Sequence, residues 1–180
     1  MTLSLLWAIA CSSAPPLPDL GKLPDFALVD QSGAVFGQRD LLGRVWVADF
    51  MFTSCPDICP VLSAHMAEIQ THYAADERVN MVSISVDPGT DTPEVLTKYA
   101  ARFGANNERW HFLTGETSAV RTVVRDGFKM VMEPGEKPAN ILHGERFVVV
   151  DETGHIRAYP DPKEPGKAEI YRAVDQLLTD

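Results

Sequence analysis

Residues 45–52 are the stretch that most restricts the fold, because Val-Trp-Val-Ala-Asp-Phe-Met-Phe is apolar on nearly both faces of an extended chain. Such a run predicts a central strand of a parallel sheet, since helices cover both faces of a parallel sheet. A helical pattern follows, with apolar side chains at Leu62, Met66, Ile69 and Tyr73. Together the two patterns predict an α/β domain.

The other apolar segments continue this alternation of strands and helices. We expect these elements, in chain order, at 26–30, 35–36, 81–86, 95–103, 111–113, 120–124, 147–150, 156–159 and 170–178. Strand–helix–strand, followed by an antiparallel hairpin and a terminal helix, is the element order of a thioredoxin-like domain. The predicted fold is therefore α/β and thioredoxin-like, with a central mixed sheet flanked by helices and an N-terminal hairpin extension.

Length and charge limit the class of protein and its partners. The chain has 180 residues, which predicts one domain or two at most. Its 16 Lys and Arg against 25 Asp and Glu give a formal net charge of −9, which repels phosphate backbones and argues against nucleic-acid binding. No apolar run reaches the roughly 18 residues that a membrane-spanning helix needs. We expect a soluble, acidic domain with a packed core.

The N-terminus predicts export. The first ten residues carry no charged side chain and lead to Cys11, just after small residues. Such a run is typical of a lipoprotein-type signal, in which that Cys is lipidated and tethers the domain to a membrane. We therefore expect a signal segment at 1–11 with lipidation at Cys11, a Pro-rich linker at 12–23 and a domain at 24–180. The alternative is a frayed apolar terminus with an incidental buried cysteine.

Three segments far apart in sequence are expected to meet at one edge of the sheet. Parallel strands joined by right-handed crossovers end on the same edge, and sites collect there. The loops after residues 52 and 86 therefore lie on one side. A strand antiparallel to these two begins on that side, so the residues before Phe147 arrive there as well.

The first of these loops carries two cysteines, Cys55 and Cys59. Pro60 fits the first position of the following helix, which puts Cys59 at or just outside the helix start. Both thiols would then lie near the positive end of the helix dipole, which favours the thiolate. The alternatives are an inert disulfide and two buried cysteines, but a disulfide that closes a loop of about five residues would restrain the unfolded chain little. We interpret the pair as functional.

The spacing of the pair suggests a metal site. Three residues between the cysteines, with Pro after the second, differ from the two of a thioredoxin-type redox motif and suit a third ligand. A mostly polar loop is expected at 133–142. His143, which ends this loop at the expected edge, is the candidate for that ligand. Copper accepts two thiolates and an imidazole, whereas structural zinc prefers four protein ligands. Asp87, at the end of the second strand, is a candidate to support the ligands by hydrogen bonding or charge, and a structural role in the turn is the alternative.

Three motifs in this order resemble the Sco/SenC family. They are Thr-Ser-Cys-Pro-Asp-Ile-Cys-Pro at 53–60, Val-Asp-Pro-Gly-Thr-Asp-Thr-Pro at 86–93 and a lone His143 before the last hairpin. The resemblance covers about 24–178 and implies a thioredoxin-like fold. It also implies an extracytoplasmic domain on the periplasmic side, anchored to the membrane by its N-terminus. Family members carry an acidic residue at the place of Asp87.

The resemblance further implies a copper site and a partner. In the family the ligands are the two motif cysteines and the late histidine, here Cys55, Cys59 and His143. The family's histidine is often preceded by Asp and followed by Ser or Thr, whereas Leu142 and Gly144 flank it here. The family helps to assemble the binuclear copper centre of cytochrome c oxidase subunit II, by delivering copper, by reducing its cysteines, or by both. Another copper protein is the alternative partner.

Two functions therefore remain open. The first is a copper metallochaperone without turnover of its own. The second is a thiol–disulfide oxidoreductase acting on a copper-protein partner, with Cys55 as the attacking thiolate and Cys59 resolving. A peroxiredoxin-like peroxidase is disfavoured, because Phe52 and Ala48 stand where that family's motif requires Thr and Pro.

Overall fold

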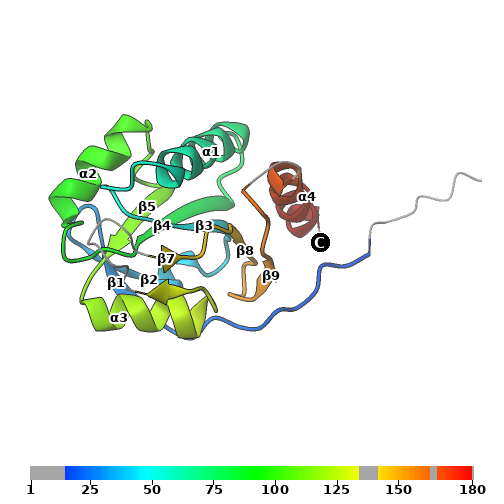
Figure 1. Cartoon of the computed structure of the whole chain (residues 1–180). Helices are drawn as coiled ribbons and strands as arrows, with labels where there is room; N and C mark the ends of the chain where they lie inside the picture. The colour runs from blue at the N-terminus through cyan, green and yellow to red at the C-terminus, as the bar shows by residue number, and fades with distance from the viewer. Residues whose placement is uncertain (1–14, 134–141, 163–165, 180) are drawn as a thin grey trace, which may run out of the picture.

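A mixed sheet forms the centre of the molecule, seen in a computed structural model that describes residues 15–133, 142–162 and 166–179 (Figure 1). Its seven strands are, in spatial order, β2 (Val35–Gly37), β1 (Ala27–Asp30), β5 (Trp110–Thr114), β4 (Val79–Ser85), β3 (Val45–Met51), β8 (Val148–Val150) and β9 (Ile156–Ala158). Strands β3, β4 and β5 are parallel neighbours, and the other pairs are antiparallel. The mixed sheet with its N-terminal hairpin confirms the predicted fold class.

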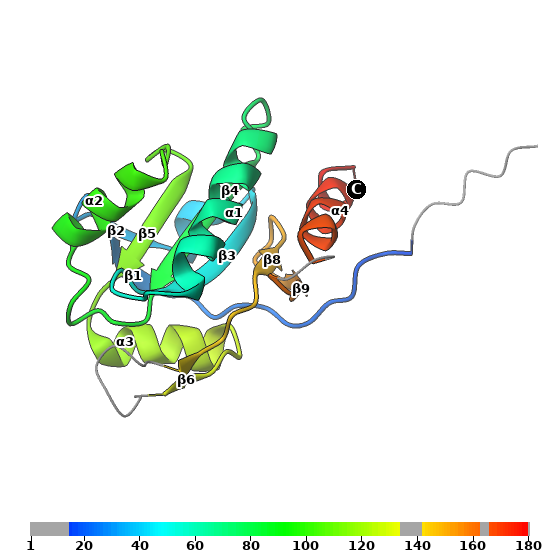
Figure 2. The same ribbon diagram turned by 45° about the horizontal axis from the view of Figure 1, so that its top comes forward.

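Helices cover both faces of this sheet. They are the 3₁₀ turn η1 (Gln38–Leu41), α1 (Ile58–His72), α2 (Pro93–Arg102), α3 (Thr117–Thr122) with the π turn η2 (Val123–Gly127), and α4 (Gly166–Thr179). Helix α1 lies beside α2, where Ser63 Oγ and Tyr99 OH are 3.0 Å apart. It also lies beside α4, where Tyr73 OH donates to Asp175 Oδ1 at 2.8 Å. Helix α3 covers the opposite face (Figures 1 and 2).

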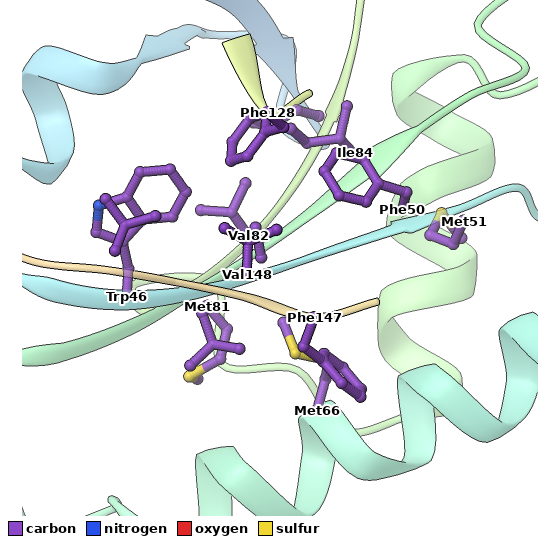
Figure 3. Close-up of a cluster of buried hydrophobic side chains, with 14 of the residues drawn as sticks. Trp46, Phe50, Met51, Met66, Met81, Val82, Ile84, Phe128, Phe147 and Val148 are labelled. Atoms are coloured by element: carbon purple, nitrogen blue, oxygen red, sulfur yellow. The ribbon is translucent and has the colours of Figure 1, made fainter. Parts of the chain in front are cut away.

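The core has two apolar layers, one on each face of β3 and β4. Every residue of β3 and β4 is buried, as expected for central parallel strands. On the α3 side, the Phe128 ring packs against Phe50 and Trp46, with centroids 5.2 and 5.9 Å apart. On the other side, Met66 of α1 lies against Phe147 (Figure 3). These layers hold the ends of β3 and β4 in fixed positions.

The predicted meeting of three segments is confirmed for the backbone. Strands β3 and β4 run parallel in full register, so the loops that follow them leave the sheet at the same edge. Strand β8 runs antiparallel to β3, with Val148 opposite Ala48. Phe147 therefore enters the sheet near the end of β3.

Residues 15–23, which belong to the predicted linker, lie along the last strand of the sheet. Leu20 and Leu23 donate backbone hydrogen bonds to Ile156 and Gly154, both at 2.9 Å. The Leu23 side chain is only 2% exposed. This part of the chain thus packs on the domain.

In the described ranges, no helix combines the length and the apolar character that crossing a bilayer requires.

A second, separate sheet consists of β6 (Met132–Glu133) and β7 (Leu142–His143), paired antiparallel. The sequence predicted a loop at 133–142, and both ends of that loop are strand residues instead. Backbone pairing brings them together, with Met132 opposite His143. We call this pair of strands the β6–β7 ribbon.

Candidate metal centre

The cysteine loop connects β3 to α1. Its backbone turns where Cys55 N–H donates to Phe52 O at 3.1 Å. Helix α1 begins at Ile58, so Cys59 is its second residue and Pro60 its third. The prediction that Pro60 occupies the first position is wrong by two residues. The first turn of a helix has N–H groups without helical partners, so a proline at the third position loses no helical hydrogen bond.

Cys55 and Cys59 are both in the thiol form, and their side chains are hydrogen-bonded to each other. Cys55 is half-buried, and Cys59 is completely buried. Burial raises the pKa of the Cys59 thiol above its ordinary value, and its hydrogen bond with Cys55 raises that pKa further. The expectation that the helix start favours a thiolate at both positions is therefore wrong for Cys59. Loss of solvation outweighs the helix dipole once the sulfur lies inside the core.

A buried carboxylate joins the cysteine loop to the loop after β4. Asp91 is fully buried, and it accepts hydrogen bonds from the backbone N–H and the hydroxyl of Thr53. It also accepts from Ser85 Oγ at 2.6 Å. These contacts show that Asp91 connects the cysteine loop to the end of β4 and the loop that follows it. Asp87, the predicted supporting residue, is half-buried at the start of the second loop.

A second buried carboxyl lies in β3 itself. Asp49 is completely buried, and its Oδ1 accepts from Ser83 Oγ at 2.5 Å. Among the described residues, its Oδ2 has no hydrogen-bond partner. Burial raises the pKa of Asp49 to about 7. Our sequence reasoning missed this residue, although a single carboxyl inside an otherwise apolar strand was the available signal.

The third predicted ligand arrives on the β6–β7 ribbon. The backbone of His143 lies in β7, and Gly144 N–H donates to Val131 O at 3.1 Å. His143 precedes Phe147 by four positions, a span of at most about 14 Å. The imidazole of His143 lies outside what the structure describes, as does Cys11, the predicted lipidation site. The three-ligand set therefore stays a prediction.

The other histidines have contacts of their own. His111 stacks on Phe36, His72 packs against Tyr171, and His155 pairs with Asp19 at 2.9 Å; His65 has its ring centroid 6.3 Å from that of Phe147. Within 15–133, 142–162 and 166–179, no three His, Cys, Asp or Glu side chains are grouped closely enough to hold a metal ion. The two sulfurs are thus the described part of the candidate centre.

Comparison with known proteins identifies the family to which this chain is related. A sequence model described as SCO1/SenC matches residues 18–179. A relative from Stutzerimonas stutzeri, named a putative copper-binding protein, is 36% identical over 167 residues, which cover 90% of this chain and 79% of the relative.

Two solved structures extend the comparison to the fold. A SCO1/SenC family lipoprotein from Bacillus anthracis str. Ames superposes with a TM-score of 0.84 at 32% identity, covering 91% of this chain and 99% of that chain. BsSco, described as a member of the Sco family of cytochrome c oxidase assembly proteins with a disulfide switch, gives 0.79 at 30% identity, covering 91% and 97%. The chain belongs to the SCO1/SenC family and has its thioredoxin-like fold.

Proposed function

We propose that this protein is a copper metallochaperone that binds one copper ion through Cys55, Cys59 and His143. The observation that carries the proposal is the pair of hydrogen-bonded thiols at the edge of the sheet, one buried and one half-buried. Thiolate sulfur is a soft ligand that selects Cu(I), and an added imidazole also suits Cu(II). The name of the Stutzerimonas stutzeri relative supports copper as the cargo.

The arrangement of the two thiols suits a cargo site. Cys59 is fixed in the first turn of α1 and has no solvent-exposed surface, so it would hold the ion from the core side. Cys55 is half-buried and lies in the loop, where an incoming ligand of a partner protein can reach it. Copper would then pass to that partner by ligand exchange. We propose that the partner site is the binuclear copper centre of cytochrome c oxidase.

We further propose that the domain acts outside the cytoplasm, on the periplasmic side, tethered by its N-terminus. The apolar segment before Cys11 supports this proposal. The Bacillus anthracis relative is a lipoprotein, which also supports it. Mass spectrometry of membrane-extracted protein would detect a lipid on Cys11.

A second candidate function is a thiol–disulfide oxidoreductase that reduces cysteines of the copper-protein partner. Its support is the contact between the Cys55 and Cys59 thiols, together with the disulfide switch reported for BsSco. In this function Cys55 attacks and Cys59 resolves, so the pair ends as a disulfide. His143 is then dispensable.

Copper titration of the reduced protein separates the two functions. We expect His143→Ala to lower the copper affinity and change the copper spectrum. The control is His155→Ala, which removes a histidine paired with Asp19 and leaves copper binding unchanged. If His143→Ala keeps the wild-type stoichiometry, affinity and spectrum, the three-ligand model is wrong. Reductase activity without any copper affinity would favour the second function.

A further inference from the structure

Asp91 fixes the start of the cysteine loop. Its Oδ2 accepts from the Thr53 backbone N–H at 3.1 Å, and its Oδ1 accepts from the Thr53 hydroxyl. Thr53 stands two residues before Cys55, and Cys55 is held in the loop between Thr53 and the start of α1. The place of the Cys55 sulfur relative to Cys59 therefore depends on how Thr53 is held.

The same carboxylate is itself held by the second loop. Ser85 Oγ donates to Asp91 Oδ2 at 2.6 Å and accepts from Asp87 N–H at 3.1 Å. The Asp91 N–H donates to Asp87 O at 2.9 Å. A continuous set of hydrogen bonds thus runs from the Asp87 loop through Asp91 to Thr53. No part of Asp91 is exposed to solvent that could replace these bonds.

We infer that Asp91 is a positioning residue for the dithiol: it ties the cysteine loop to the Asp87 loop and keeps the Cys55 sulfur next to Cys59. The inference rests on the proposed function, because it takes Cys55 and Cys59 as the working pair. The Asp91 side chain is hydrogen-bonded to Thr53 and Ser85, so it acts on the dithiol through Thr53.

The dithiol–disulfide equilibrium measures this positioning directly. Joining two thiols in one molecule favours the disulfide in proportion to their effective concentration. A cysteine loop released from Asp91 lowers that effective concentration and shifts the equilibrium toward the dithiol. Two thiolates that are no longer held in place also bind copper more weakly, because binding then includes the cost of ordering them.

Three variants cut the connection at different points. Thr53→Val removes the hydroxyl donor and keeps the shape and charge, Ser85→Ala removes the link to the second loop, and Asp91→Asn changes the acceptor itself. The matched control is Asp151→Asn at the opposite edge of the sheet. Asp151 also is buried and accepts from a threonine backbone N–H and hydroxyl, both of Thr153, at 2.9 and 2.7 Å.

The experiment equilibrates each full-length variant in dithiothreitol redox buffers and counts free thiols, and it measures Cu(I) affinity by competition with bathocuproine. We expect Asp91→Asn to shift the equilibrium toward the dithiol about tenfold, which is about 30 mV for this two-electron couple. Thr53→Val and Ser85→Ala shift it the same way by a smaller factor. Asp151→Asn lowers stability without shifting the dithiol–disulfide equilibrium.

Two outcomes overturn the inference. One is an unchanged equilibrium in Thr53→Val and Asp91→Asn. The other is an equal shift in Asp151→Asn, which would trace the effect to general destabilisation. If Asp91→Asn does not fold, the thiol equilibrium of Thr53→Val alone tests the inference, and an unchanged equilibrium overturns it. A wild-type protein that binds no copper refutes the proposed cargo, while the thiol equilibrium still tests Asp91.

Discussion

The cysteine loop and the β6–β7 ribbon approach the same edge of the sheet but are held in different ways. The loop lies between a fully buried strand and a helix of 15 residues, and Asp91 bonds it to a second loop. The ribbon has two residues in each strand and stands apart from the seven-stranded sheet. Its described links include Gly144 N–H to Val131 O and Met130 N–H to Val124 O.

This difference suggests that different interactions stabilise the two parts of the candidate site. An isolated two-stranded ribbon is marginally stable, so the place of β7 depends on a few local contacts. The cysteine pair depends on the whole core and on buried hydrogen bonds. Substitutions in one region should therefore leave the other region's properties intact.

The largest effect should come from removing a sulfur of the fixed pair. We expect Cys59→Ser and Cys55→Ser each to lower copper affinity by more than the 10- to 100-fold that losing an outer-shell partner typically costs. Each also abolishes the internal disulfide. Calorimetric copper titration measures the affinity, with Cys11→Ser as a control that binds normally. Full affinity in Cys59→Ser would rule out the buried sulfur as a ligand.

Asp49 in β3 should also make the free energy of unfolding depend on pH. Its pKa is raised from 3.8 to about 7 by burial, so the native state keeps a proton that the unfolded chain loses. The native state binds more protons, and the free energy of unfolding should therefore fall by about 1.4 kcal/mol per pH unit between these two values. Above the folded pKa the loss is complete and constant.

Asp49→Asn removes this slope because the amide does not titrate. Urea unfolding of both proteins at several pH values gives the difference between the two curves, which cancels the contributions of other carboxylates. The comparison uses the slope, so a constant offset from the buried amide does not affect it. Parallel curves would show that Asp49 ionises normally in the folded protein.

A smaller, local effect should follow from crowding the ribbon. A Cβ at Gly144 would lie 2.7 Å from Met130 Sδ and 3.3 Å from Met130 Cβ, so Gly144→Ala must displace Met130. We expect copper affinity to fall about tenfold, which is about 1.4 kcal/mol, with no change in the thiol equilibrium. The control is Gly89→Ala, where the nearest atom to the new Cβ is Asp87 Oδ1 at 4.0 Å. A shifted thiol equilibrium in Gly144→Ala would mean that the two regions are coupled.

The smallest effect should come from Thr92, which lies just outside the hydrogen bonds that hold the cysteine loop. Thr92 follows Asp91 and is the N-cap of α2, accepting from Val95 N–H at 3.5 Å. Thr92→Ala should lower stability by about 1 kcal/mol through loss of the cap. Thermal unfolding measures this loss, while the thiol equilibrium and copper affinity stay at wild-type values. A change in either would extend the positioning set beyond Asp91.

Most of the fold could be predicted because local sequence patterns specify its helices and strands. The run of apolar residues at 45–52 gave β3, and the spacing of Leu62, Met66 and Ile69 gave α1. The start of α1 could not be fixed from Pro60, because proline is tolerated throughout the first turn. Pairing at the ends of the loop at 133–142 was missed, since two-residue strands have no periodicity to detect.

The sequence by itself determined that two cysteines follow a buried parallel strand, and hence which edge of the sheet they occupy. It could do so because strand order and crossover handedness follow general rules. Only the tertiary structure decided that Cys59 is fully buried with a raised pKa, and that Asp91 reaches Thr53 from 38 residues away. Burial and long-range hydrogen bonds depend on atoms brought together by the rest of the chain, which no local pattern specifies.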